Sequence, residues 1–380
     1  MATDNSGKSH NIGRLKSVMV ETGLDAFVVL TPENVVYSTG AHFVWSDLNH
    51  LMDPRDDYFT CVIPANGEPT LLVWKREYTL AQQMSWVNDI RDYPIHGMLN
   101  LLVDVLKEKN LDRARIGVEK LYMPFGIFEH LHQALPQVEF VAGDGALSKA
   151  RMVKSPWEIE TLGHVGYLTS KAIYLAWERA RLGDRERDIC ADMTNHVMWF
   201  GAEPQVFSYG SGPNSLPGHR WGDDRRLELG DIVHSDAKGR LRGYWADVSR
   251  NCVVGTPTPQ QADIYRRLVT IHDRVVEQLR PGVLSSEIYE LYMRANQEEG
   301  IEVPPRLICH GIGTSLHEAP LIEPNCEPIV LEEGMVVTVE PAFYDPEIFY
   351  HYENMVVITT KGGDVLSNYE TDPNQLYVIR

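Results

Sequence analysis

The sequence predicts two domains, an α/β domain over residues 1–150 and an α+β domain over residues 151–380. Three observations lead to this prediction. The 380 residues are enough for two hydrophobic cores. Short strands and helices alternate in the first part of the chain, and in the second part an order of two helices followed by strands occurs twice.

The first domain is predicted from short apolar runs that alternate with segments of helical spacing. Strands are expected in the stretches DAFVVL, YFTCVIP, PTLLVW and RIGVE, and helices in GRLKSVMVETG and PFGIFEHLHQAL. Such alternation is typical of an α/β domain, in which helices cover a sheet.

The second domain is predicted to begin with a long helix. Ser155, Pro156 and Glu158 supply an N-cap, a proline at the first helical position and the acid that completes a capping box. We expect this helix to run towards Arg181 and a second one to follow over 184–200. The peptide TPQQ repeats the start signal further along, and LSSEIYELYMRANQEEG predicts the fourth helix.

Composition excludes several classes of protein. The net charge of −18, from 35 basic and 53 acidic residues, disfavours binding to nucleic acid or to an anionic membrane. No apolar run approaches the roughly 20 residues that cross a bilayer, and the polar start MATDNSGKSHN predicts no secretory signal. Five irregularly spaced cysteines argue against a disulfide framework. We therefore expect a cytoplasmic protein whose partners are small molecules and metal cations.

Four acidic residues lie beside strands that are expected to be buried. Glu340 ends the strand VVTVE, and Glu353 begins the strand ENMVVIT. Asp236 and Asp247 are 11 positions apart, separated by a glycine-containing basic loop, so an antiparallel hairpin would place them on neighbouring strands. Any one of these acids could be an ordinary surface residue. Together they favour a cation site, because buried carboxylates are costly without a positive partner.

Three histidines accompany the acids. His310 and His317 lie in the glycine-broken segment CHGIGTSLHEAP, and His219 ends the segment SYGSGPNSLPGH. A single histidine is more often a structural, hydrogen-bonded residue. Gly311 and Gly313 favour a functional interpretation of His310, because glycine lets a backbone approach a ligand closely.

The ordered motifs resemble those of the pita-bread metallopeptidases, which include Xaa-Pro dipeptidase, aminopeptidase P and methionine aminopeptidase. The resemblance covers about residues 150 to 380, and ENVVYSTGAHF is similar to the upstream domain of creatinase and prolidase. It implies a creatinase/prolidase-type α/β N-terminal domain followed by an α+β pita-bread catalytic domain. The segments that carry it are GSGPNSLPGH, GDIVHSDAKG, GYWADVSR, CHGIGTSLHEAP, VVTVEP and HYENMVVIT.

This resemblance implies a set of metal ligands and catalytic residues. Two divalent ions would neutralise four buried carboxylates, and oxygen-rich ligation favours Mn²⁺, with Co²⁺, Fe²⁺ or Zn²⁺ as alternatives. In the family a hydroxide bridges the metals and attacks the substrate. The implied metal ligands are Asp236, Asp247, His310, Glu340 and Glu353; His219 and His317 would bind the substrate and the tetrahedral intermediate, and Glu353 or Glu340 would transfer the proton.

The substrate is less strongly indicated than the metal site. His351, expected to bind substrate, stands where proline-specific members commonly have arginine. We favour an Xaa-Pro peptidase that acts on short peptides. The alternatives are a hydrolase of a small non-peptide C–N substrate, similar to ectoine hydrolase, a lyase on the same fold, or a binding protein without catalysis. The resemblance also implies a homodimer, in which the aromatic residues Tyr37, Phe43 and Trp45 would either contact the partner or form core.

Overall fold

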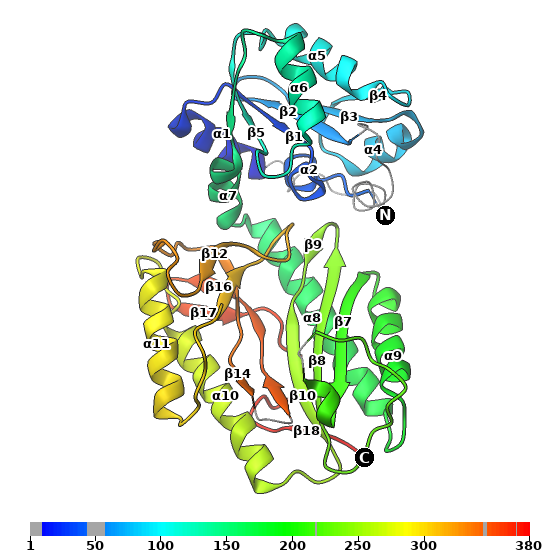
Figure 1. Cartoon of the computed structure of the whole chain (residues 1–380), viewed down its shortest axis with the longest axis vertical. Helices are drawn as coiled ribbons and strands as arrows, with labels where there is room; N and C mark the ends of the chain where they lie inside the picture. Colours follow the sequence, from blue (N-terminus) through cyan, green and yellow to red (C-terminus); the bar gives the residue numbers. More distant parts are fainter. Residues whose placement is uncertain (1–9, 44–57, 217–218, 345–347, 370) are drawn as a thin grey trace. The chain divides into compact units, whose positions relative to one another are not determined.

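A computed structural model describes residues 10–43, 58–216, 219–344, 348–369 and 371–380 (Figure 1). The chain divides into two compact units, Met1–Arg151 and Met152–Arg380. No helix among these described residues is long and apolar enough to cross a membrane.

The first unit is built on a six-stranded mixed sheet with the order β4-β3-β2-β1-β5-β6. β1 pairs antiparallel with β2 and parallel with β5. The strands are β1 (Ala26–Val29), β2 (Thr60–Pro64), β3 (Thr70–Trp74), β4 (Asp89–Tyr93), β5 (Arg115–Val118) and β6 (Glu139–Ala142). The helices are α1 (His10–Thr22), α2 (Pro32–Thr39), α4 (Tyr78–Met84), α5 (Met98–Glu108), α6 (Phe125–Ala134) and α7 (Asp144–Met152), with a 3₁₀ turn at Lys75–Glu77.

Both faces of this sheet are covered. Successive side chains of a strand point to opposite faces, so Phe27 packs with Leu15 of α1 on one side while Val28 packs with Leu102 of α5 on the other. A central strand buried on both faces needs apolar residues at every position, which explains the uninterrupted run AFVV. The predicted α/β class of this region is confirmed.

The second unit contains two five-stranded sheets and four long helices. One sheet has the order β18-β10-β8-β7, with β9 paired to β8, and the other has the order β12-β11-β13-β16-β17. The helices are α8 (Pro156–Arg179), α9 (Glu186–Trp199), α10 (Pro259–Gln278) and α11 (Ser285–Glu298). The strands are β7 (Glu203–Ser211), β8 (Ile232–Leu241), β9 (Tyr244–Trp245), β10 (Val248–Val254), β11 (Cys309–Gly311), β12 (Glu318–Ile322), β13 (Val336–Val339), β16 (Asn354–Thr359), β17 (Gly362–Val365) and β18 (Tyr377–Ile379); β14 (Ala342–Tyr344) pairs with β15 (Phe349–His351), and a 3₁₀ turn covers Gly212–Ser215.

Each sheet of the second unit packs against its own helix pair. α8 and α9 contact β8 and β7, whereas α10 and α11 contact β17 and β12; Figure 1 shows the first pair in green and the second in yellow-green to yellow. The sheets meet at a bridge between Ser249 and Glu353, where the Glu353 N–H donates to the Ser249 carbonyl at 3.0 Å. The buried Arg250 guanidinium donates to the carbonyl of Glu353 and, at 2.6 Å, to Oδ1 of Asn354. The acidic residues on either side are thereby held in fixed relative positions.

The helix starts predicted for the second unit are confirmed. α8 begins with a complete capping box between Ser155 and Glu158, and α10 begins with one between Thr258 and Gln261. The predicted loop after Asp236 is wrong, because β8 continues through the basic residues to Leu241. The strand persists there because β8 is paired on both sides and the buried basic side chains have acidic partners.

The aromatic residues near the start of the chain are placed only in part. Tyr37 and Phe43 are buried in the core of the first unit, which favours the core interpretation for these two. Trp45 lies outside the described residues. All five cysteines are free, as the spacing predicts.

Gly311 is required by close packing between two strands. A β-carbon added there would lie 2.2 Å from the carbonyl oxygen of Ala319 in β12. We predict that Gly311→Ala destabilises the protein by about 1–3 kcal/mol, because the strands must move apart. Thermal unfolding followed by circular dichroism measures the loss.

Gly163 offers a matched control in α8. A β-carbon at this position would meet only side-chain atoms of Leu366 at ordinary contact distances of 3.7–4.0 Å. Gly163→Ala should keep or raise the melting temperature, since alanine favours a helix by up to about 1 kcal/mol over glycine. Equal melting temperatures for Gly311→Ala and the unaltered protein would contradict the packing explanation.

Candidate metal centre

The two predicted aspartates lie side by side on adjoining strands. Asp236 occupies the middle of β8 and pairs in register with Ser249 of β10. Asp247 immediately precedes β10, so the same register places it opposite Lys238. Both carboxylates are buried.

The two predicted glutamates lie opposite each other at the ends of two neighbouring strands of the second sheet. Val339 of β13 pairs with Asn354 of β16, and continuing that register by one residue places Glu340 opposite Glu353. Both glutamates are buried. The bridge from Ser249 to Glu353 joins the two sheets at this point, which brings the glutamates to the aspartates.

His310 lies among these carboxylates. Its Nδ1 is 3.0 Å from the Gly311 carbonyl, so Nδ1 carries the proton and Nε2 presents a lone pair. Nε2 is 3.9 Å from Asp247 Oδ2, 3.9 Å from Glu340 Oε1 and 3.8 Å from Glu353 Oε1. Burial lowers the pKa of His310 to about 4, so the ring is neutral at pH 7.

A buried lysine completes the cluster. The Nζ of Lys238 forms ion pairs with Oδ1 of Asp236 and, at 2.9 Å, with Oδ1 of Asp247. The neighbouring carboxylates outweigh burial and raise the pKa of Lys238 above its usual value.

Arg306 adds a second positive charge. Its Nη2 donates to Oε2 of Glu340 at 2.8 Å, and its Nε donates to the Leu307 carbonyl at 2.9 Å. This guanidinium therefore occupies one oxygen of Glu340, while the other oxygen faces His310.

The pKa values of the acids reflect this crowding. Burial is the main cause that raises the pKa of Asp247 and of Glu353 well above the usual range, and nearby carboxylates add to it. Burial acts in the same direction on Asp236, but Lys238 and neighbouring histidines hold its pKa below the usual value. Fully ionised, the four carboxylates would therefore carry more negative charge than Lys238 and Arg306 balance.

The remaining predicted histidines surround the cluster. The ring of His317 stacks on that of His310 with centroids 3.8 Å apart, and its side chain is exposed. The exposed His219 places Nε2 3.6 Å from Asp236 Oδ2. His351 is buried, with Nε2 3.7 Å from Glu340 Oε2. The structure therefore brings every predicted site residue to one place.

The sequence matches two family models. Residues 160–360 match metallopeptidase family M24, and residues 11–153 match the creatinase/prolidase N-terminal domain. The chain belongs to metallopeptidase family M24. It is therefore an enzyme of a metal-dependent family, and the predicted resemblance is confirmed.

Relatives and solved structures agree with this assignment. An Xaa-Pro dipeptidase of Pyrococcus furiosus is 28% identical over 363 residues, covering 94% of this chain and 98% of its own. The prolidase of Pyrococcus horikoshii has a TM-score of 0.79 at 26% identity, over 95% of this chain and 99% of its own. The X-Pro aminopeptidase of Thermotoga maritima has a TM-score of 0.82 at 23% identity, over 97% and 99%. The predicted fold, a creatinase-type domain followed by a pita-bread domain, is confirmed.

The side chains present fit a divalent ion. Ligand atoms that each lie about 2.1 Å from a shared ion are at most about 4.2 Å apart. His310 satisfies this limit with both glutamates, because its Nε2 lies 3.9 Å from Glu340 Oε1 and 3.8 Å from Glu353 Oε1, distances that are too long for hydrogen bonds. The ligand atoms of all three residues lie within 4.8 Å of one another. Asp236, Asp247 and Glu353 form a second group with ligand atoms within 4.8 Å of one another.

Lys238 and Arg306 were not predicted from the sequence as residues of the site. A signal for Lys238 was present, because it lies two positions after Asp236 and alternate residues of a strand share a face. Arg306 had no such signal. It lies outside the described helices and strands and is 34 residues from its partner Glu340.

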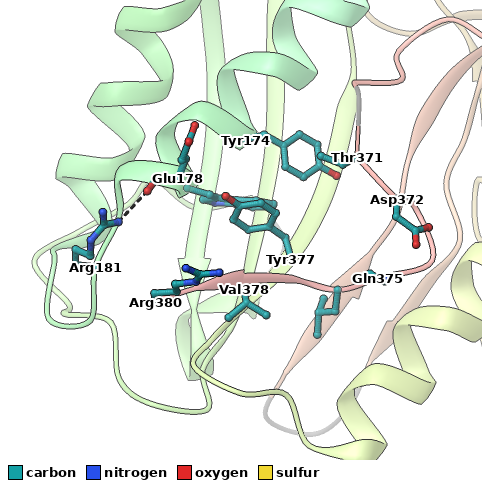
Figure 2. Close-up of a pocket in the computed structure, with 11 residues that line it drawn as sticks. Tyr174, Glu178, Arg181, Thr371, Asp372, Gln375, Tyr377, Val378 and Arg380 are labelled. Carbon is teal, nitrogen blue, oxygen red and sulfur yellow. Dashed lines mark hydrogen bonds between the residues drawn. The ribbon is translucent and has the colours of Figure 1, made fainter.

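A separate cavity lies between α8 and the C-terminal strand (Figure 2). It has a volume of about 690 Å³ and is lined in part by Tyr174, Tyr377 and Asp372. Arg181 donates to the carbonyl of Glu178 at its edge, at 2.8 Å. Of the described residues that line it, none is a histidine or cysteine, so it offers no imidazole or thiolate to a metal.

Replacing His310 and replacing His317 should have different effects on metal binding and turnover. We predict that His310→Ala loses bound metal, because it removes the imidazole that faces three carboxylates. His317→Ala should keep its metal and lose about 10²–10³ in kcat, as expected for a donor to developing oxyanion charge. Metal content by mass spectrometry and kcat are measured on both proteins.

The outcome that contradicts this division is also clear. A purely packing role for His317 would lower the melting temperature and leave turnover nearly normal. Metal loss in His317→Ala would instead identify His317 as a metal ligand. Its ligand atom lies within 4.8 Å of those of Asp247 and His310, which is close enough for a shared ion.

Proposed function

We propose that this enzyme is a divalent-metal-dependent peptidase that cleaves Xaa-Pro dipeptides or short peptides next to proline. The observation that carries the proposal is the neutral His310 Nε2 placed 3.8–3.9 Å from three buried carboxylate oxygens. A relative named Xaa-Pro dipeptidase that aligns with 94% of the chain supports the choice of substrate.

A bound divalent ion would supply a Lewis acid that polarises the scissile carbonyl and lowers the pKa of water. The chain's own groups do the rest. His310, Glu340 and Glu353 would hold the ion, with Asp247 beside them, and Glu353 would transfer a proton to the leaving nitrogen. His317 and His219, both exposed beside the cluster, would bind substrate oxygen atoms.

Several finer properties are expected from the ligand residues and the family resemblance, and they stay predictions. The ligand residues alone predict two divalent ions per chain and a bridging hydroxide, with Mn²⁺ favoured over Co²⁺, Fe²⁺ and Zn²⁺. Lys238 and Arg306 add positive charge to the site, which affects how many divalent ions it can bind. A homodimer and a cytoplasmic location remain predictions.

A second function is favoured by one residue. His351 takes the place of the arginine that is common in proline-specific members, and it is buried against Glu340 rather than extended to solvent. Imidazole does not reproduce the fixed donors of a guanidinium. A small cyclic amide, as in ectoine hydrolysis, or an elimination substrate is therefore the alternative. A binding protein without catalysis is disfavoured because the sequence keeps all five residues expected to bind metal, and all five are buried.

The proposal is tested with a panel of dipeptides and Mn²⁺. We predict hydrolysis of Xaa-Pro dipeptides with a kcat/KM at least tenfold above that for matched Xaa-Ala dipeptides. A chelator should abolish this activity, because the Lewis acid is removed, and added Mn²⁺ should restore it. Release of free proline is the measurement.

Cyclic amides and guanidino compounds form the comparison panel. Hydrolysis of one of these, with all dipeptides left intact, would refute the peptidase proposal and support the alternative. Activity that survives chelation and extensive dialysis would contradict metal dependence.

A further inference from the structure

A buried ammonium group lies inside the acidic cluster. Two groups of possible metal ligands overlap at Glu353. One contains Asp236 and Asp247, and the other contains His310 and Glu340. Each group offers three ligand atoms close enough to surround one ion. The Lys238 ammonium contacts both aspartates of the first group.

The position of Lys238 follows from the strands that carry it. It lies two residues after Asp236 on β8, on the same face, and its register partner is Asp247. Its side chain is buried. No alternative acidic partner is needed to explain its burial, since two carboxylates compensate the cost of removing the charge from water.

A metal ion and this ammonium would compete for the same two carboxylates. An ion held by both aspartates must approach each carboxylate to about 2.0–2.2 Å. Lys238 Nζ lies 2.9 Å from Asp247 Oδ1 and forms the equivalent contact with Asp236 Oδ1. The buried ammonium would strongly repel a divalent ion placed beside it.

The charge of the cluster also indicates how many divalent ions it can hold. Metal ligands must be deprotonated, and in that form the four carboxylates carry four negative charges, of which Lys238 and Arg306 balance two. His310 is neutral in the tautomer that its hydrogen bond sets. A single divalent ion therefore balances the cluster, whereas two would leave it with an excess positive charge in a buried site.

We infer that this enzyme binds one divalent ion per chain, at His310, Glu340 and Glu353, and that the Lys238 ammonium occupies the position of a second ion between Asp236 and Asp247. The inference deepens the proposed function, on which it rests for the presence of a metal. It assigns Lys238 as a positioning residue that fixes the two aspartates.

Metal counting on the purified full chain tests this. The protein is saturated with Mn²⁺, freed of excess ion and analysed by mass spectrometry, and its electron paramagnetic resonance spectrum is recorded. We expect one Mn²⁺ per chain with the spectrum of an isolated ion. Lys238→Ala should bind two, with a spectrum of magnetically coupled ions about 3.5–4 Å apart.

Lys154→Ala is the matched control. Lys154 is also buried and also forms an ion pair, with Glu318 at 2.7 Å, but it contacts neither aspartate. This variant should keep one ion and an uncoupled spectrum. A gain of a second ion in both variants would mean that loosened packing, not the removal of Lys238, creates the site, and would overturn the inference.

Other outcomes are equally decisive. Two ions, or a coupled spectrum, in the unaltered protein would overturn the inference even if Lys238→Ala fails to fold. One ion in a folded Lys238→Ala would also overturn it. The metal count does not depend on the substrate, so a chain with one ion that leaves Xaa-Pro dipeptides intact refutes only the proposed function, and a two-ion chain that cleaves them refutes only the role of Lys238.

Discussion

Repulsion among four buried carboxylates is the constraint on which this site depends. Asp247 and Glu353 show it most clearly, because burial and neighbouring charge raise the pKa of each well above the usual range. Such a cluster stays fully ionised at neutral pH only when cations compensate it, and otherwise takes up protons. Two cationic groups belong to the chain, on Lys238 and Arg306, and a bound divalent ion would supply the remaining compensation. The polypeptide thereby limits how much metal charge the site can accept.

The fold keeps the acids together against this repulsion. Two come from the sheet of β8 and β10 and two from the sheet of β13 and β16. The sheets are joined at the Ser249–Glu353 bridge, and the Arg250 guanidinium bonds to the backbone and side chain just beyond it. Helices bury the outer face of each sheet, so the strands cannot separate to relieve the charge without exposing core residues.

Much of this architecture could be predicted from the sequence, because its signals are local. Capping boxes indicated helix starts, and alternating apolar runs indicated the strands that carry Glu340 and Glu353. The cationic groups of the site were not predicted, because local sequence signals did not reveal them. Lys238 was assigned to a loop because glycine and basic residues followed Asp236, although pairing on both sides extends β8 through it. Arg306 reaches its partner only through tertiary structure, which no periodicity encodes.

An ammonium group differs from a metal ion in ways that matter for the proposed chemistry. It donates hydrogen bonds and supplies charge, but it has no empty orbital to accept a carbonyl or water oxygen. It also cannot dissociate, so Asp236 and Asp247 stay compensated when the metal leaves. Lewis acidity would then be confined to the ion at His310, Glu340 and Glu353, with Lys238 contributing fixed electrostatic stabilisation beside it. The chain would exchange a second source of catalytic acidity for a site whose aspartates are organised before any metal binds.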